Sequence, residues 1–121
     1  MAPVSYTHLD VYKRQANNCF ENVAGIYCGI KASPLVRRNT CRKNTEDGIV
    51  VAGAAAPTLE QNVCSNNSRF GILFLENSRG VAHYNRCMEN EVGIYITTAA
   101  NPLLQNNNCD GNIIAGIGRP S

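Results

Sequence analysis

The chain has 121 residues, of which 44% are hydrophobic, and its eleven basic and nine acidic residues give a formal net charge of +2. A charge so close to balance gives no reason to expect a nucleic acid or an anionic membrane as partner. No apolar run approaches the roughly 20 residues that a transmembrane helix needs. We therefore expect neither a nucleic-acid partner nor a membrane partner.

The first segment, Pro3–Gln15, reads PVSYTHLDVYKRQ and shares nothing with the rest of the chain. Codons for this peptide resemble two transposon mosaic ends joined head to head, an element used as an adapter in sequencing libraries. The second half of that element is the reverse complement of the first, which natural coding sequence rarely is. We therefore assign residues 1–15 to an artefactual leader outside the fold, with a natural disordered leader as the alternative.

From Ala16 onward one phrase recurs with a fixed period. A cysteine returns at steps of 22, 23, 23 and 22 residues, as Cys19, Cys41, Cys64, Cys87 and Cys109. An asparagine stands two residues before each cysteine, as Asn17, Asn39, Asn62, Asn85 and Asn107, and another three residues after it, as Asn22, Asn44, Asn67, Asn90 and Asn112. Gly-Ile pairs begin at Gly25, Gly48, Gly71, Gly93 and Gly116. A period of this size indicates a repeat architecture.

Periods in the twenties fit leucine-rich repeats and parallel β-helices. Here each unit has short alternating apolar segments, without a leucine ladder or a run of helix formers, and this is typical of half-buried strands. Asn and Gly stand where the backbone must turn, since both tolerate left-handed conformations. The sequence predicts an all-β fold, a right-handed parallel β-helix over residues 16–121. We expect about 4.5 coils of 22–23 residues, three short strands in each, truncated at both ends.

Stacked coils place equivalent residues in columns along the axis, at the strand spacing of about 4.8 Å. The inward columns are expected to be Ile26, Ile49, Ile72, Ile94 and Ile117; Cys28, Val51, Phe74 and Ile96; Val36, Leu59, Ala82 and Leu104; and the five repeat cysteines. The two asparagine columns are expected to stack their amides in hydrogen-bonded ladders. For the cysteines we expect a packed ladder of free thiols, because neighbours in a column lie too far apart for a disulfide. Disulfides or a bound metal are the alternatives.

The phrase P-x-apolar-x-x-N-x-C-x-x-N, followed by G-I-x-apolar, resembles the bacterial right-handed parallel β-helix repeat family of the pectate-lyase-like superfamily. That family includes repeats of periplasmic copper-maturation proteins and carbohydrate-active β-helices, so the resemblance implies an exported or cell-surface protein. It is specific for fold and not for activity. Soft sulfur ligands select Cu(I), but here they are expected inside the stack, and we expect no metal and no cofactor.

Glycoside hydrolysis needs two carboxylates on either side of a bond. The outward columns Arg37, Glu60, His83, Gln105 and Arg42, Ser65, Met88, Asp110 do not place two acids on neighbouring coils. Glu46 and Asp47 are neighbours in a turn, where a solvated pair is the simpler interpretation. We therefore expect no catalytic residue, and we interpret His83 as a surface histidine.

After each Gly-Ile pair the outward residues form an apolar column of Tyr27, Val50, Leu73 and Tyr95. Contiguous apolar patches mark interaction sites, and the two tyrosines are suited to stacking on an extended glycan. We expect a non-catalytic scaffold or binding module, for carbohydrate or protein, within a larger protein. The face could instead pack against another part of that protein, and open solenoid ends could self-associate. The alternative function is a fragment of a polysaccharide lyase or glycoside hydrolase whose active site lies outside this segment.

Overall fold

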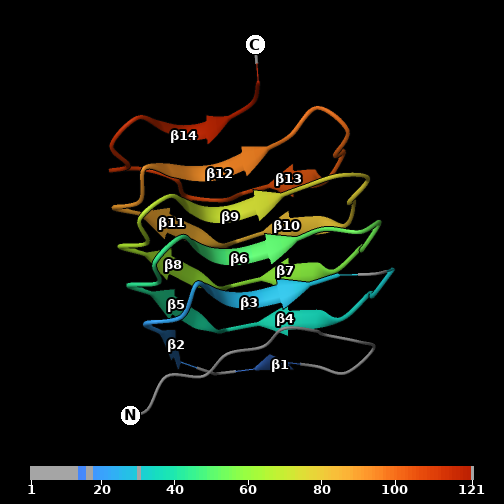
Figure 1. Cartoon of the computed structure of the whole chain (residues 1–121), viewed down its shortest axis with the longest axis horizontal. Helices are drawn as coiled ribbons and strands as arrows, with labels where there is room; N and C mark the ends of the chain where they lie inside the picture. The colour runs from blue at the N-terminus through green and yellow to red at the C-terminus, as the bar shows by residue number, and fades with distance from the viewer. Residues whose placement is uncertain (1–13, 16–17, 30, 121) are drawn as a thin grey trace.

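The structure, a computed structural model, describes residues 14–15, 18–29 and 31–120. These residues form fourteen β-strands and no helix, and the strands stack as a solenoid of successive coils (Figure 1). Every strand pairs in parallel with the equivalent strand of an adjacent coil, as β3 does with β6 and β6 with β9. The all-β parallel solenoid with three strands per coil, predicted from the repeat, is confirmed.

Three parallel sheets run along the solenoid. The long sheet has strands of four or five residues: β3 (Ala24–Cys28), β6 (Asp47–Val51), β9 (Phe70–Phe74), β12 (Val92–Ile96) and β14 (Ala115–Gly118). The charged sheet contains β1 (Arg14–Gln15), β4 (Leu35–Arg37), β7 (Thr58–Glu60), β10 (Val81–His83) and β13 (Leu103–Gln105). The cysteine sheet contains β2 (Asn18–Phe20), β5 (Thr40–Arg42), β8 (Val63–Ser65) and β11 (Arg86–Met88).

Two residues of the expected leader, Arg14 and Gln15, form β1 and pair with Val36 and Arg37 of β4. A strand this short pairs through backbone groups that any sequence offers, so the pairing carries no information about where these residues come from. The rest of the leader, residues 1–13, lies outside the described residues.

The core lies between the three sheets, where the inward columns meet. Ile26, Ile49, Ile72 and Ile94 are in register and fully buried. Ile117 pairs with Ile94 in the same column, yet it is 51% exposed, because β14 is the last strand of the long sheet and no further described coil covers it.

The glycines of the first four Gly-Ile pairs each lie close to a cysteine of the next coil, whereas Gly116 lies close to Cys109 of its own coil. A Cβ on Gly48 would lie 2.5 Å from the carbonyl oxygen of Gly71 and 3.1 Å from the Cβ of Cys64. Any larger residue would push the coils apart at this corner. The Gly-Ile part of the phrase therefore reflects close packing against the cysteine column.

Two ladders of buried asparagine amides connect the coils. In the first, the backbone N–H and the Nδ2 of Asn62 both donate to the Oδ1 of Asn85 at 2.9 Å, and the same Nδ2 donates to the carbonyl of Val36 at 3.0 Å. In the second, Asn67 donates in the same way to Asn90 at 3.0 Å and to the carbonyl of Cys41 at 3.1 Å. The first ladder runs from Asn39 through Asn62 and Asn85 to Asn107, and the second from Asn44 through Asn67 and Asn90 to Asn112.

The left-handed turn conformation was expected at the asparagines, but it belongs to their neighbours. The residue before each ladder asparagine has a positive φ, for example 55° at Gln61 and at Asn66, and these side chains are exposed. The ladder asparagines are buried, because their amides are needed between the coils. The exposed neighbour therefore accommodates the strain of the turn.

The repeat cysteines form a column of free thiols. Cys19, Cys41, Cys64 and Cys87 are in register and fully buried, whereas Cys109, in the last coil, is half-buried. Hydrogen bonds with Cys41 and Cys87, together with burial, raise the pKa of the Cys64 thiol well above its ordinary value. Burial also raises the pKa of Cys28 to about 12.

Cys64 should therefore react slowly with thiol reagents until the chain unfolds. Replacing Cys64 by Ser should lower the free energy of unfolding by about 1–3 kcal/mol, because the buried hydroxyl would meet only weakly accepting sulfur atoms. Time-resolved alkylation with mass spectrometry, alongside urea denaturation, measures both effects. Labelling of native Cys64 as fast as that of Cys109 would contradict the packed column.

Candidate functional site

The outer face of the long sheet is unusually well buried. β6 and β9 have all five residues buried, although alternate side chains of each strand point away from the core. On this outer face Tyr27, Val50, Leu73 and Tyr95 are in register, as expected from the sequence. Val50 and Leu73 are each only 5% exposed, however, so they are less accessible than a simple outward column suggests.

A second outward column explains this burial. The residue before each Gly-Ile pair lies on the same face, and Phe70 and Val92 pack with Val50 and Leu73 into a cluster separate from the core. The Phe70 and Tyr95 rings are stacked, with centroids 4.7 Å apart. Sequence reasoning missed this column, although its position directly before each glycine repeats as regularly as the others. The column consists of Ala24, Asp47, Phe70, Val92 and Ala115.

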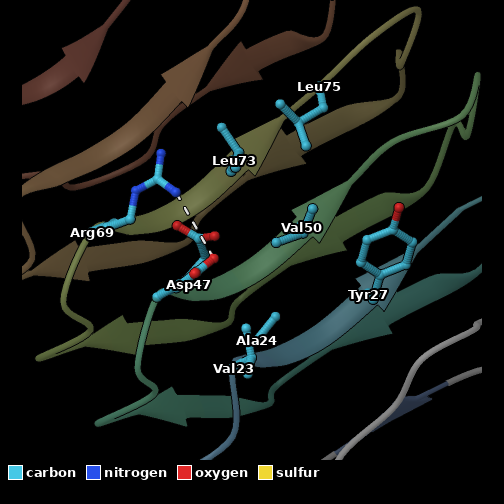
Figure 2. A pocket seen from close by; sticks show the side chains of 9 residues that line it. Val23, Ala24, Tyr27, Asp47, Val50, Arg69, Leu73 and Leu75 are labelled. Atoms are coloured by element: carbon cyan, nitrogen blue, oxygen red, sulfur yellow. Dashed lines mark ion pairs between the residues drawn. The ribbon is translucent and has the colours of Figure 1, made fainter.

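A depression of about 280 Å³ opens in this face across β3, β6 and β9 (Figure 2). Val50 and Leu73 lie in its middle, with Tyr27 at one end and Asp47 and Arg69 at the other. Val23, Ala24, Leu75 and Glu46 complete its lining. The depression thus has an apolar centre, an aromatic end and a charged end.

The charged end combines two acids with one arginine. Asp47 is only 3% exposed, and its Oδ1 accepts a hydrogen bond from the backbone N–H of Phe70 at 3.2 Å. Arg69 lies over the Phe70 ring, 4.8 Å from its centroid, and its Nη1 lies 3.8 Å from Oε1 of Glu46. Burial raises the pKa of Asp47 from 3.8 to about 6, against the lowering effects of the Phe70 hydrogen bond and of Arg69. Asp47 was expected to be solvated, and in this respect the expectation was wrong.

The two tyrosines of the predicted column have different surroundings. The Tyr27 ring lies along its own strand over Gly29, where an added Cβ would be 2.7 Å from Cε1 of the ring. The Tyr95 ring stacks on Phe70 and also contacts the position of Gly118. Tyr27 lines the depression and Tyr95 does not. A role for both rings as glycan platforms stays a prediction.

The charged sheet carries the other polar column considered from the sequence. Arg37, Glu60, His83 and Gln105 are in register. Glu60 lies between two partners, with Oε2 3.0 Å from Nε of Arg37 and Oε1 3.0 Å from Nε2 of His83. The Arg37 contact has the geometry of an ion pair rather than of a hydrogen bond. This arrangement is a charge ladder along the outside of the solenoid, without a second acid next to Glu60.

Comparison with known proteins identifies the family of this chain. A family model described as a right-handed β-helix region matches residues 10–118. The chain belongs to the right-handed β-helix family. The handedness expected from the repeat is thereby confirmed. Searches among curated proteins and among solved structures found no match.

Membership of the right-handed β-helix family establishes the fold and leaves the activity open, because one fold hosts many functions. Within the part of the β-helix that the structure describes, no three His, Cys, Asp or Glu side chains are grouped to hold a metal ion. The same residues include no helix long and apolar enough to cross a membrane. The depression on the long sheet, which combines apolar, aromatic and charged side chains, is the candidate binding site.

The raised pKa of Asp47 predicts a pH-dependent effect on the stability of this β-helix. The ionised Asp47 carboxylate is disfavoured in the folded state and lowers the free energy of unfolding. This destabilisation is fully present above about pH 6 and disappears as the pH falls towards 4, where the carboxyl group is protonated. Asp47→Asn should therefore raise the free energy of unfolding at pH 8 by about 1–3 kcal/mol and have little effect at pH 4.

Urea denaturation of both proteins at the two pH values measures this difference. Glu46→Gln is the matched control, since its half-exposed side chain forms only a loose surface ion pair. If Asp47→Asn raised the free energy of unfolding equally at both pH values, burial of the ionised carboxylate would not be the cause.

Proposed function

We propose that the chain is a non-catalytic β-helix module whose outer long-sheet face binds a carbohydrate or a protein, within a larger protein. The observation that carries the proposal is the second apolar cluster, formed by Val50, Phe70, Leu73 and Val92 outside the core. A solenoid already buries its core between its three sheets, so an outer apolar cluster is not needed to close the fold. Partly exposed side chains packed against the cluster, including Tyr27, Leu75 and Tyr95, extend it to the surface, and contiguous apolar surface is typical of interaction sites.

The exposure of the surrounding residues supports the same face. Val23, at the edge of the depression, is 63% exposed, and Tyr27 and Leu75 are partly exposed. The cluster therefore continues from buried residues at its centre to accessible apolar residues at its rim. A partner would contact the accessible rim, and the buried residues beneath would hold the rim side chains in place. Family resemblance favours an exported or cell-surface location for this function.

The second candidate is a segment of a polysaccharide lyase or glycoside hydrolase with its active site elsewhere. Enzymes of this architecture usually form their clefts from long loops. Here the connections from β6 to β7, from β9 to β10 and from β12 to β13 each have six residues. This regularity favours the scaffold and binding module over the enzyme.

The ends of the stack provide a further surface for self-association. At the last coil Ile113, Ile114 and Ile117 are 82%, 69% and 51% exposed. Association through these residues would be independent of the long-sheet face, so the two surfaces can be tested separately.

Replacing Leu73 and Tyr95 together by Ser should abolish partner binding or self-association at the long-sheet face, with at least a tenfold loss of affinity. The core columns are untouched, but Leu73 is 5% exposed and packs with Val50 and Phe70, so its loss should also lower the free energy of unfolding by about 2–4 kcal/mol. Circular dichroism and urea denaturation therefore establish that the variant is folded under the conditions of the binding assay. Binding is measured on a glycan array and self-association by analytical ultracentrifugation. The matched control replaces Arg37 and His83 by Ala on the charged sheet. Loss of association in the control, with none in the Leu73/Tyr95 variant, would place the site on the other face.

A further inference from the structure

The charged end of the depression has unused hydrogen-bonding capacity. Glu46 and Arg69 are each about half exposed, and the 3.8 Å between Oε1 and Nη1 is too long for a hydrogen bond. Among the described residues, neither side chain makes a hydrogen bond to another group. A carboxylate that accepts and a guanidinium that donates therefore stand side by side at the rim, both open to a ligand.

This pair suits a group that donates and accepts at once. A hydroxyl can donate its proton to Glu46 and accept a hydrogen bond from Arg69. Two neighbouring hydroxyls can occupy both side chains together, and hydrogen bonds to charged partners are the stronger ones. Adjacent hydroxyls on a rigid ring are the characteristic feature of a sugar.

The rest of the depression fits the apolar part of the same ligand. Val50 and Leu73 form its centre, and Tyr27 bounds the end opposite Arg69 (Figure 2). A sugar ring has a face of C–H groups that packs on apolar and aromatic side chains, while its hydroxyls project from the ring edge. A volume of about 280 Å³ has room for one such ring rather than for a long segment of polymer.

The charges of the site distinguish between classes of sugar. Glu46 and the buried Asp47 face a single cation, Arg69, so the charged end has an excess of negative charge when both acids are ionised. Asp47 lies beside Arg69 and adds its charge without needing contact with the ligand. A carboxylate on the ligand would be placed next to two carboxylates, and like charges at this distance repel.

We infer that this depression binds one uncharged sugar ring of a glycan, through its hydroxyls at Glu46 and Arg69 and its C–H face over the apolar floor of Val50 and Leu73 and against the more accessible Tyr27 and Leu75. The site discriminates against uronic acids. The inference rests on the proposed function, because it assigns a ligand class to the same face.

Titration calorimetry on the whole chain tests the inference with two sets of probes. The first set contains neutral oligosaccharides of glucose, mannose, xylose and galactose, and the second contains oligogalacturonate. At least one neutral probe should bind with a Kd below about 1 mM, and oligogalacturonate should bind at least about tenfold more weakly. Glu46→Gln should weaken the neutral probe at least about fivefold and reduce the discrimination against oligogalacturonate. Glu89→Gln, at an exposed acid that does not line the depression, is the matched control and should change neither affinity.

Three outcomes would overturn the inference: no binding by any probe, oligogalacturonate binding at least as tightly as the neutral probes, or an unchanged affinity in Glu46→Gln. The proposed function has its own readout in the Leu73/Tyr95 double variant. If the parent chain binds a protein or a charged glycan and the Leu73/Tyr95 variant does not, the binding face is correct and only the assigned ligand class is wrong. If instead binding of every partner is lost only on replacing Arg37 and His83, both the inference and the proposed function are wrong.

Discussion

Two columns of buried asparagine amides determine how the coils of this β-helix are stacked. Within each column the Oδ1 of one asparagine accepts two bonds from the coil before it, as Asn85 does from the N–H and Nδ2 of Asn62. The Nδ2 also reaches a backbone carbonyl, as Asn62 reaches Val36. An amide used in this way has no capacity left for water, so a coil displaced by one residue would leave several buried polar groups without partners. The asparagines thereby enforce the register that places the apolar columns inside and the binding face outside.

The candidate site follows from that register. Because each coil repeats the last, Val50 and Leu73 must lie next to one another, and so must Asp47 and Phe70. The apolar cluster arises where the repeat places Phe70 and Val92 beside the predicted column. Asp47 is the exception in its column, a carboxylate among apolar neighbours, and burial raises its pKa to about 6. An ionisable group held at such a cost in a depression is a frequent mark of a functional site.

The sequence was sufficient for most of what depends on the period, although the outward column of Ala24, Asp47, Phe70, Val92 and Ala115 was missed. It predicted the coils, the three strands in each, the isoleucine and cysteine columns and the outward column from Tyr27 to Tyr95, because strict repetition turns sequence position into spatial position. It did not predict the burial of Val50 and Leu73, which depends on the side chains around them, or the direction of the Tyr27 and Tyr95 rings, which depends on rotamers. It also placed the left-handed conformation at the asparagines, whereas the structure assigns it to exposed neighbours such as Gln61 and Asn66. Backbone propensity allows the left-handed conformation at the ladder asparagine or at the residue before it. The hydrogen bonds of the asparagine amides between coils place it at the residue before.

The central claim is that the amide ladders hold the coils in register, and a comparison of two aspartate variants tests it most directly. Asn62→Asp keeps the shape of a buried ladder residue but removes its Nδ2 donor and adds a charge, whereas Asn66→Asp makes the same change at an exposed position on the same coil. Chemical denaturation at neutral pH should give a loss of about 3 kcal/mol or more for Asn62→Asp and a change within about 0.5 kcal/mol for Asn66→Asp. Equal and small effects at both positions would contradict the claim.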